Sequence, residues 1–253
     1  MQINQNLAKL ATKIDHTLLK PDATEKDIIT LCEQACKYRF KAVCVEPKWL
    51  SIVSIKLQGT PILPITVISF PHGTDPLESK IKETQKAVTN GAQEIDMVIN
   101  REHLKNKEYT NLFKEIQSVV QAAKPIPVKV ILETSELSER EIIVACTTAQ
   151  IAGASHVKTS TGFSRQGATT QHIQTMQATI GEQLKIKASG GIKSLRTANE
   201  MLRAGADRLG CSNSYVIIEE LSAEQREHNP LTKPSYRPKE EIRVHKATPP
   251  TLD

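Results

Sequence analysis

Short runs rich in Val and Ile recur along this 253-residue chain, and an amphipathic segment separates each run from the next. Capping-box patterns at residues 24–27 and 138–141 indicate where two of these segments begin as helices. Gly91, Gly153 and Gly205 each stand between a helical pattern and the next strand, where a left-handed helix cap is expected. The predicted strands are residues 13–18, 42–45, 65–69, 94–99, 128–132, 156–159, 185–188 and 208–211.

Eight strand–helix units predict a closed (β/α)8 TIM barrel, an α/β fold that typically needs about 250 residues. An open doubly wound sheet is the alternative, but no G-x-G-x-x-G motif follows the first strand. We expect a single barrel domain over residues 1–221. Residues 222–253 contain five prolines, many charges and no sustained apolar periodicity, so we expect an irregular, partly disordered C-terminal tail with no function that the sequence assigns.

Composition and motifs exclude several kinds of partner. The net charge is +5, but Lys and Arg are scattered without interleaved aromatics, so we expect no nucleic-acid partner. No 18 apolar residues run together and the N-terminus lacks an apolar signal region, so we expect no membrane partner. The five cysteines form no C-x-x-C pair, which favours a reduced, cytoplasmic protein. No H-x-H or H-E-x-x-H pattern is present, so we expect no metal site.

Residues within a barrel strand face the helices and the lumen in turn. If the apolar residues of each strand pack against the helices, the polar residues between them point into the lumen. That set comprises Asp15, Thr17, Asp96, Lys129, Glu133, Lys158 and Lys187. A purely structural lumen is filled by Val, Ile and Leu, so these charges indicate a functional site. We expect His16 and His156 to face outward and to be packed or hydrogen-bonded rather than catalytic.

Two interpretations fit the lysine pair Lys158 and Lys187. At a separation of roughly 6 Å and an effective dielectric constant near 20, repulsion between the two ammonium groups is about 2.8 kcal/mol, or roughly two pKa units. A lysine whose pKa is lowered in this way can act as the nucleophile of Schiff-base chemistry. In the other interpretation, both lysines form structural ion pairs with Asp15 and Asp96. The spacing alone leaves both interpretations open.

Glycines mark the ends of the last three predicted strands. Gly162 follows the sixth strand, Gly190 and Gly191 follow the seventh, and Gly210 and Ser212 lie at the end of the eighth. Backbone N–H groups in the loops after strands 7 and 8 form the usual phosphate site of this architecture. The sequence therefore predicts a phosphorylated small molecule as the ligand.

Taken together, these segments resemble the deoxyribose-phosphate aldolase family, and the likeness extends over residues 1 to about 220. The matching motifs, in chain order, are IDHTLLKPDAT (14–24), AVCV (42–45), SFPHG (69–73), GAQEIDMVIN (91–100), VKVILET (128–134), VKTSTGF (157–163) and KASGGI (187–192). The resemblance implies a lyase, a metal-free class I aldolase without a cofactor. It would reversibly cleave 2-deoxy-D-ribose 5-phosphate to acetaldehyde and D-glyceraldehyde 3-phosphate, in the catabolism of deoxyribonucleosides and deoxyribose phosphate.

The resemblance also implies a role for each site residue. Lys158 would form the Schiff base with C1, and Lys187 would tune that amine and relay protons. Asp96 would act through water as general acid and base, with Asp15 supporting the lysines. The expected substrate-binding residues are Gly162, Gly190, Gly191 and Ser212 for the phosphate, and Thr17 and Thr161 for hydroxyl groups. The family also implies a homo-oligomer, either a dimer or a tetramer.

Three positions depart from the family pattern. Asn213 stands where a second serine is common, Phe163 where some members carry lysine, and Glu46 differs from the usual residue. These departures bear on phosphate affinity and substrate preference, and they leave the lysine chemistry intact. Two alternative functions remain open: another Schiff-base barrel that acts on a different phosphosugar, as a transaldolase does, and a catalytically silent barrel that only binds a phosphorylated metabolite.

Overall fold

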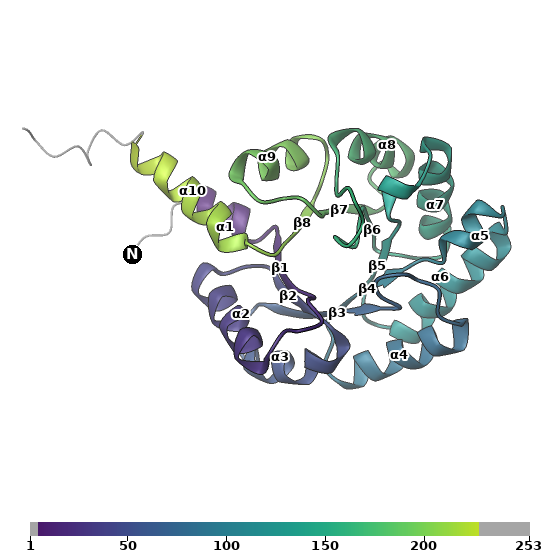
Figure 1. Ribbon diagram of the computed structural model, residues 1–253, viewed down its shortest axis with the longest axis horizontal. Helices are drawn as coiled ribbons and strands as arrows, with labels where there is room; N and C mark the ends of the chain where they lie inside the picture. The colour runs from purple at the N-terminus through teal and green to yellow at the C-terminus, as the bar shows by residue number, and fades with distance from the viewer. Residues whose placement is uncertain (1–4, 228–253) are drawn as a thin grey trace, which may run out of the picture.

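Eight parallel strands close into a barrel in the computed structural model, which describes residues 5–227 (Figure 1). Each strand pairs with its neighbour in the chain, and β8 pairs back to β1. The strands are β1 (Ile14–Leu18), β2 (Ala42–Val45), β3 (Leu63–Ile68), β4 (Glu94–Val98), β5 (Val128–Ile131), β6 (His156–Lys158), β7 (Lys185–Ser189) and β8 (Arg208–Cys211). All eight predicted strands are confirmed, with differences only at their ends.

Helices surround the barrel and connect consecutive strands (Figure 1). They are α1 (Gln5–Ala11), α2 (Glu25–Tyr38), α3 (Leu50–Lys56), α4 (Leu77–Thr89), α5 (Arg101–Lys105), α6 (Tyr109–Ala123), α7 (Glu139–Ile151), α8 (Thr170–Ile180), α9 (Leu195–Arg203) and α10 (Ser214–Glu227), with 3-10 turns η1 (Pro47–Trp49) and η2 (Thr134–Glu136). Thr24 and Ser138 form both predicted capping boxes, at the starts of α2 and α7. Gly91, Gly153 and Gly205 have the positive φ that a left-handed cap requires.

The main hydrophobic core lies between the strands and the helices. Outward-facing strand residues such as Val43, Ile95 and Val130 are fully buried in it. A second, smaller cluster lines the lumen on the β1–β3 side and comprises Leu19, Ala42, Cys44, Ile65 and Val67. The lumen therefore has an apolar wall on one side, and its charged residues come from β1 and from β4 to β8.

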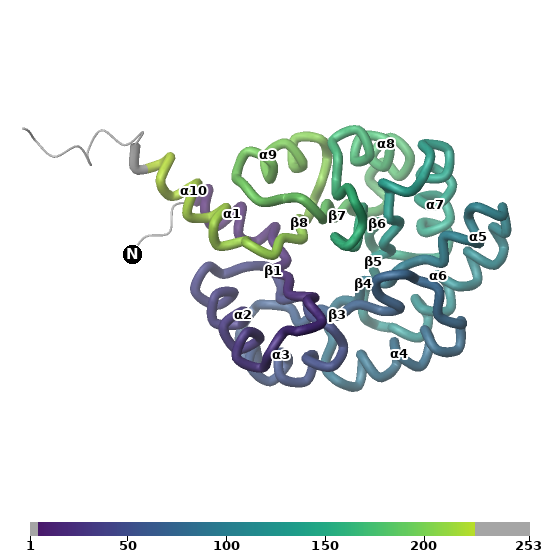
Figure 2. The backbone as a smooth tube through the Cα atoms, in the orientation of Figure 1, coloured from purple at the N-terminus to yellow at the C-terminus, as the bar shows by residue number. Residues whose placement is uncertain are grey.

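Helices α1 and α10 lie side by side next to β1 and β8, where the barrel closes (Figure 2). The sequence analysis did not predict α1. The domain boundary predicted after Leu221 falls inside α10, which continues through Glu227. The rest of the predicted tail, residues 228–253, lies outside the described residues.

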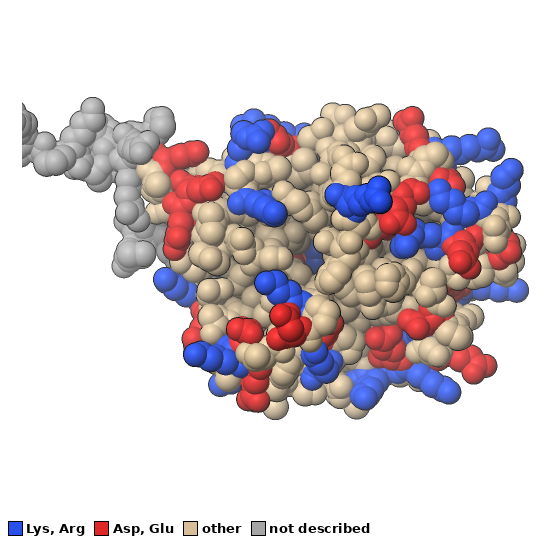
Figure 3. Space-filling model, viewed as in Figure 1, with Lys and Arg blue, Asp and Glu red and all other residues tan. Residues whose placement is uncertain are grey.

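Charged side chains of both signs are interspersed on the face of the molecule that Figure 3 shows, without a basic stripe among the residues described there. No helix within residues 5–227 is long and apolar enough to cross a membrane.

Candidate active site

Strands β4 to β8 and β1 bring seven charged side chains together inside the barrel, and all seven are buried. They are Asp15 on β1, Glu94 and Asp96 on β4, Lys129 on β5, Lys158 on β6, Lys187 on β7 and Arg208 on β8. The alternation of the strands predicted five of them correctly. It missed Glu94 and Arg208, which lie two residues before Asp96 and Gly210 and therefore on the same lumenal face of their strands.

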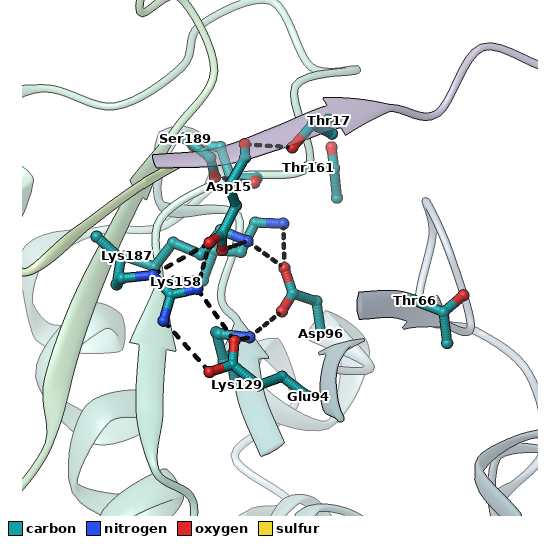
Figure 4. Close-up of polar contacts among 12 residues, drawn as sticks. Asp15, Thr17, Thr66, Glu94, Asp96, Lys129, Lys158, Thr161, Lys187 and Ser189 are labelled. Carbon is teal, nitrogen blue, oxygen red and sulfur yellow. Dashed lines mark hydrogen bonds and ion pairs between the residues drawn. The ribbon is translucent and has the colours of Figure 1, made fainter. Parts of the chain in front are cut away.

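Asp96 binds all three lysines of this group, and Figure 4 shows it beside them. Its Oδ2 accepts hydrogen bonds from the Nζ atoms of Lys158 and Lys187, each at 2.8 Å. Its Oδ1 accepts a hydrogen bond from Lys129 Nζ at 3.0 Å. One buried carboxylate therefore holds three lysine amines within reach of one another.

The other two carboxylates, Asp15 and Glu94, also bind these lysines and in addition bind Arg208. Lys187 Nζ lies 2.6 Å from Asp15 Oδ2, and Lys129 Nζ lies 2.6 Å from Glu94 Oε2. The Arg208 guanidinium donates two hydrogen bonds to Glu94, at 3.2 and 3.1 Å, and it also donates to Asp15 Oδ1 from Nε at 3.1 Å and from Nη2. Each buried charge thus has at least one partner of opposite sign, as burial requires.

The two lysines of the pair have opposite pKa shifts. Burial lowers the pKa of Lys158, and the positive charge of Lys187 lowers it further, while Asp96 opposes both effects. Burial would also lower the pKa of Lys187, but its ion pairs with Asp15 and Asp96 outweigh burial and raise that pKa well above its ordinary value. Both lysines thus form an ion pair with Asp96, as one interpretation of the sequence predicted, and the pKa of Lys158 is also lowered, as the other requires.

The carboxylates of this group remain ionised. Burial alone would raise the pKa of Asp96, but Lys129, Lys158 and Lys187 outweigh it and hold that pKa well below its usual range. The pKa of Asp15 is likewise lowered against burial, by Lys187 and Arg208. A charged Asp96 therefore lies within hydrogen-bonding distance of a lysine whose pKa is lowered.

A cavity of about 190 Å³ opens above these charges, and Lys158 is on its wall. All six predicted substrate-binding residues line the same cavity: Thr17, Thr161, Gly162, Gly190, Gly191 and Ser212. Gly162, Gly190 and Gly191 have φ values of +90°, +84° and +77°, which favour glycine. Helix α10 begins at Ser214, two residues after Ser212, so its N-terminal N–H groups add to an anion-binding rim.

The sequence model of the DeoC/LacD family of aldolases matches residues 9–213 of this chain. The chain belongs to this family. A deoxyribose-phosphate aldolase of Staphylococcus epidermidis is 48% identical over 218 residues, which cover 86% of this chain and 98% of the relative. Another, from Clostridium tetani, is 47% identical over 208 residues, 82% of this chain and 96% of the relative. The chain is therefore an enzyme, an aldolase of the lyase class, and the family resemblance of its motifs is confirmed.

A solved structure agrees with this assignment. The deoxyribose phosphate aldolase from Aeropyrum pernix, described as a unique tetramer, superposes with a TM-score of 0.80 at 31% identity, over 86% of this chain and 93% of that one.

Among the cavity-lining residues that the sequence analysis did not assign to the substrate site of this aldolase are three with polar side chains. Ser189 and Lys193 follow Lys187 on β7 and in its loop, and Asn213 precedes α10. Lys193 supplies an exposed cation beside the glycine cradle. Phe163 is not among the lining residues, and its ring instead meets the ring of Phe70 edge-on at 5.2 Å.

Glu133 lies two residues after the end of β5 and bonds the loop that follows β6. Its Oε2 accepts a hydrogen bond from the backbone N–H of Thr161 at 3.2 Å and a second one from the Thr161 hydroxyl. These two hydrogen bonds to a buried carboxylate fix the orientation in which Thr161 lines the cavity. Glu133 is not among the residues that line the cavity, and its predicted lumenal position stays a prediction.

Gly210 leaves space for the amine network. A Cβ atom at this position would lie 3.2 Å from Cε of Lys187 and 3.0 Å from Cβ of Ser189. A larger residue on this strand would therefore push against the side chain that bridges Asp15 and Asp96.

The two strand histidines differ from each other. His16 faces outward as predicted, and its ring nitrogens lie 3.0 Å from Ser214 Oγ and 2.8 Å from Gln34 Oε1. The outward position predicted for His156 is wrong, because Val157 packs in the outer core and both of its neighbours on β6 therefore face the lumen. Burial and the nearby charge of Lys129 lower the pKa of His156 to about 3, so the ring is neutral.

Within residues 5–227, no group of three His, Cys, Asp or Glu side chains is arranged to hold a metal ion.

Proposed function

We propose that this aldolase reversibly cleaves 2-deoxy-D-ribose 5-phosphate to acetaldehyde and D-glyceraldehyde 3-phosphate through a Schiff base on Lys158. The observation that carries the proposal is the position of Lys158. Of the buried cations in the described residues, it alone lines the cavity, and burial lowers its pKa. A lysine of lowered pKa at the wall of a cavity with a glycine-rich rim suits an aldehyde substrate with a phosphate at its far end.

In the proposed reaction, the Lys158 amine attacks the C1 carbonyl, and loss of water from the carbinolamine gives a protonated imine. Asp96, acting through water, accepts the proton of the C3 hydroxyl while the C2–C3 bond breaks. The electron pair of that bond moves toward the imine nitrogen and forms an enamine, and C3 becomes the aldehyde carbon of D-glyceraldehyde 3-phosphate. Protonation of the enamine at C2 and hydrolysis release acetaldehyde and regenerate the amine.

In this proposal the remaining residues either bind the substrate or support Lys158. Lys187 keeps its charge next to Lys158 and relays protons, and Asp15 holds Lys187 in place through their 2.6 Å ion pair. The phosphate lies against the backbone of the cradle, and Thr17 and Thr161 contact hydroxyl groups. The residues proposed for the phosphate are Gly162, Gly190, Gly191 and Ser212.

Three further features belong to the proposal. The enzyme acts in deoxyribose phosphate catabolism without a metal or cofactor. It forms a homo-oligomer, a dimer or a tetramer, as the tetrameric relative from Aeropyrum pernix supports. It works in the cytoplasm, which the five free cysteines support.

The test is direct. Purified enzyme with 2-deoxy-D-ribose 5-phosphate and a chelator should release acetaldehyde and D-glyceraldehyde 3-phosphate, and Lys158→Met should release neither. Activity lost on chelation would contradict the metal-free mechanism. A transaldolase-like function would instead show as cleavage of ketose phosphates with no cleavage of the deoxyribose ester.

A further inference from the structure

The charged groups of the lumen form a closed ring in which acids and cations alternate. Each neighbouring pair in the ring is joined by an ion pair or a hydrogen bond between side chains. In order, the ring runs Asp96, Lys187, Asp15, Arg208, Glu94, Lys129 and back to Asp96. Figure 4 shows the part that joins Glu94 through Lys129 to Asp96.

The ring is electrically balanced without Lys158. It contains three carboxylates and three cations, and the amine of Lys158 is bonded to the ring only through Asp96 Oδ2. A protonated Lys158 would therefore leave one surplus positive charge in a buried site, which is costly. A neutral Lys158 leaves the ring with a net charge of zero.

Other ionisable groups around Lys158 do not disturb this balance. Burial raises the pKa of the Cys44 thiol on β2 to about 11, and the pKa of His156 on β6 is about 3, so both are neutral near pH 7. Strand β3 faces the lumen with Ile65 and Val67. Glu133 lies beyond β5 and is engaged by Thr161. The ionisable groups that face Lys158 from the packed strands are then the ring itself: Asp15, Glu94, Asp96, Lys129, Lys187 and Arg208.

We propose that Glu94, Lys129 and Arg208 are positioning residues that keep the Lys158 amine neutral by completing a charge-balanced ring. The proposal deepens the function proposed above and rests on it, since a neutral Lys158 matters only to an enzyme that uses this amine. None of the three residues lines the cavity, so none contacts substrate. They act through Asp96 and Asp15, to which Lys129 and Arg208 are bonded directly.

The ring predicts the direction in which the pKa of Lys158 moves when one ring residue is removed. A merely structural role of these residues predicts no such direction. Removal of a cation leaves an uncompensated carboxylate, which favours a protonated Lys158 and raises its pKa. Removal of an acid leaves a surplus cation, which favours the neutral amine and lowers the pKa of Lys158. Removal of one of each restores the balance and should restore the titration.

The experiment compares wild type with Lys129→Met, Glu94→Gln and the double variant. Both substitutions are close to isosteric, and Lys129→Arg, which retains the charge, serves as the control. Titration of Lys158 is followed by the chemical shift of its Cε in protein labelled with 13C at lysine Cε, and Lys158→Met assigns the resonance. The pH dependence of kcat/KM is measured in parallel, and circular dichroism confirms that each variant folds.

We expect the Lys158 midpoint to move up by ~1 pH unit in Lys129→Met and down by ~1 pH unit in Glu94→Gln, the scale of one uncompensated charge at an effective dielectric constant near 20. The double variant and Lys129→Arg should titrate close to wild type. The acidic limb of kcat/KM should follow the midpoint in each variant. Unchanged midpoints, or shifts of the same sign in both single variants, would overturn the ring proposal.

The two proposals fail in different ways. The titration reports the charge of Lys158 whether or not the enzyme turns over. Midpoints that move as expected in an enzyme that does not cleave 2-deoxy-D-ribose 5-phosphate would support the ring and refute the substrate. Cleavage of 2-deoxy-D-ribose 5-phosphate, together with Lys158 midpoints that do not move, would support the proposed substrate and refute the ring.

Discussion

Lys158 and Lys187 show how far the surroundings of a residue decide its chemistry. Both are buried lysines on adjacent strands, and both bond the same carboxylate oxygen of Asp96 at 2.8 Å. Lys187 has a second carboxylate, Asp15, at 2.6 Å, whereas Lys158 faces the cavity instead. One additional ion pair is enough to raise the pKa of Lys187 while burial lowers that of Lys158. Burial lowers the pKa of Lys158 more than repulsion from Lys187 does, although repulsion was the effect that the sequence suggested.

Replacement of Lys187 tests this division of roles. Lys187→Leu leaves Asp15 and Asp96 short of a cation, so Lys158 should be held protonated and kcat should fall by about 100-fold or more, the scale of lost acid–base function. Circular dichroism should show a retained fold. Full activity of Lys187→Leu would contradict a tuning role for this lysine.

Lys193 provides a test of the phosphate end. As an exposed cation on the cavity wall, it should strengthen binding of a phosphate while contributing little to the chemical step. In Lys193→Gln we expect KM for 2-deoxy-D-ribose 5-phosphate to rise about 5-fold or more, on the scale of one charge-assisted hydrogen bond, with kcat nearly unchanged. KM for unphosphorylated deoxyribose should not change, and an equal rise for both sugars would argue against a phosphate contact.

The sequence predicted the lumenal residues that lie between clear apolar neighbours, such as Asp96 between Ile95 and Met97. It missed Glu94 and Arg208 because each opens its strand and has an apolar neighbour on one side only. Their partnership joins residues 114 positions apart and depends on the stagger of a closed barrel, which local patterns do not encode.

At the scale of elements, the strands divide the lumen into two halves with different chemistry. The β1–β3 side contributes the apolar cluster with Cys44, Ile65 and Val67, and the strands from β4 onward contribute most of the charges. The low dielectric of the apolar half strengthens the ion pairs beside it. It also explains why burial has the largest effect on the pKa of Lys158.

A second buried ion pair anchors the loop that follows β3. Lys80 of α4 pairs with Glu115 of α6, and its Nζ also donates to the carbonyl oxygens of Gly73 at 2.6 Å and Val98 at 3.0 Å. Lys80→Met should destabilise the fold by about 3 kcal/mol, because Glu115 is left as an uncompensated buried charge. Urea unfolding measures the loss, and Lys80→Met combined with Glu115→Gln should recover part of it. A single variant as stable as wild type would contradict this anchoring role.

The sequence predicted the strands well because each is a short Val- and Ile-rich run bounded by turn residues, and packing agrees with that local preference. It did not predict α1 or the full length of α10. These two helices stabilise each other by contact across the closure of the barrel, and that contact between the chain ends has no local signature.

At the scale of the whole molecule, the buried charges make stability depend on pH. Asp15, Glu94 and Asp96 have lowered pKa values in the folded state, so the unfolded chain binds protons first and stability falls as pH drops through 4.5 and 3.8, their ordinary values. His156 acts earlier and in the same direction. Its pKa is about 3 when folded and 6.5 when free, so its contribution is present above pH 6.5 and is lost on acidification toward pH 3.

Unfolding free energy measured in urea at several pH values tests this linkage. We expect wild type to lose about 2 kcal/mol between pH 6.5 and pH 4.5 from His156, on the scale of one linked proton. In His156→Gln the slope over this interval should be shallower, while the steeper loss below pH 4.5 remains. A wild-type stability that rises on acidification would have the wrong sign for the buried network.

The central claim, a Schiff base on Lys158, is tested most directly by borohydride trapping. Enzyme treated with 2-deoxy-D-ribose 5-phosphate and borohydride should gain about one reduced adduct per chain, as expected of a single covalent nucleophile, and peptide mass spectrometry should locate it on Lys158. Lys158→Met, treated in the same way, should gain none. An unchanged mass of the wild-type chain, or an adduct on another lysine with Lys158 unmodified, would contradict the account.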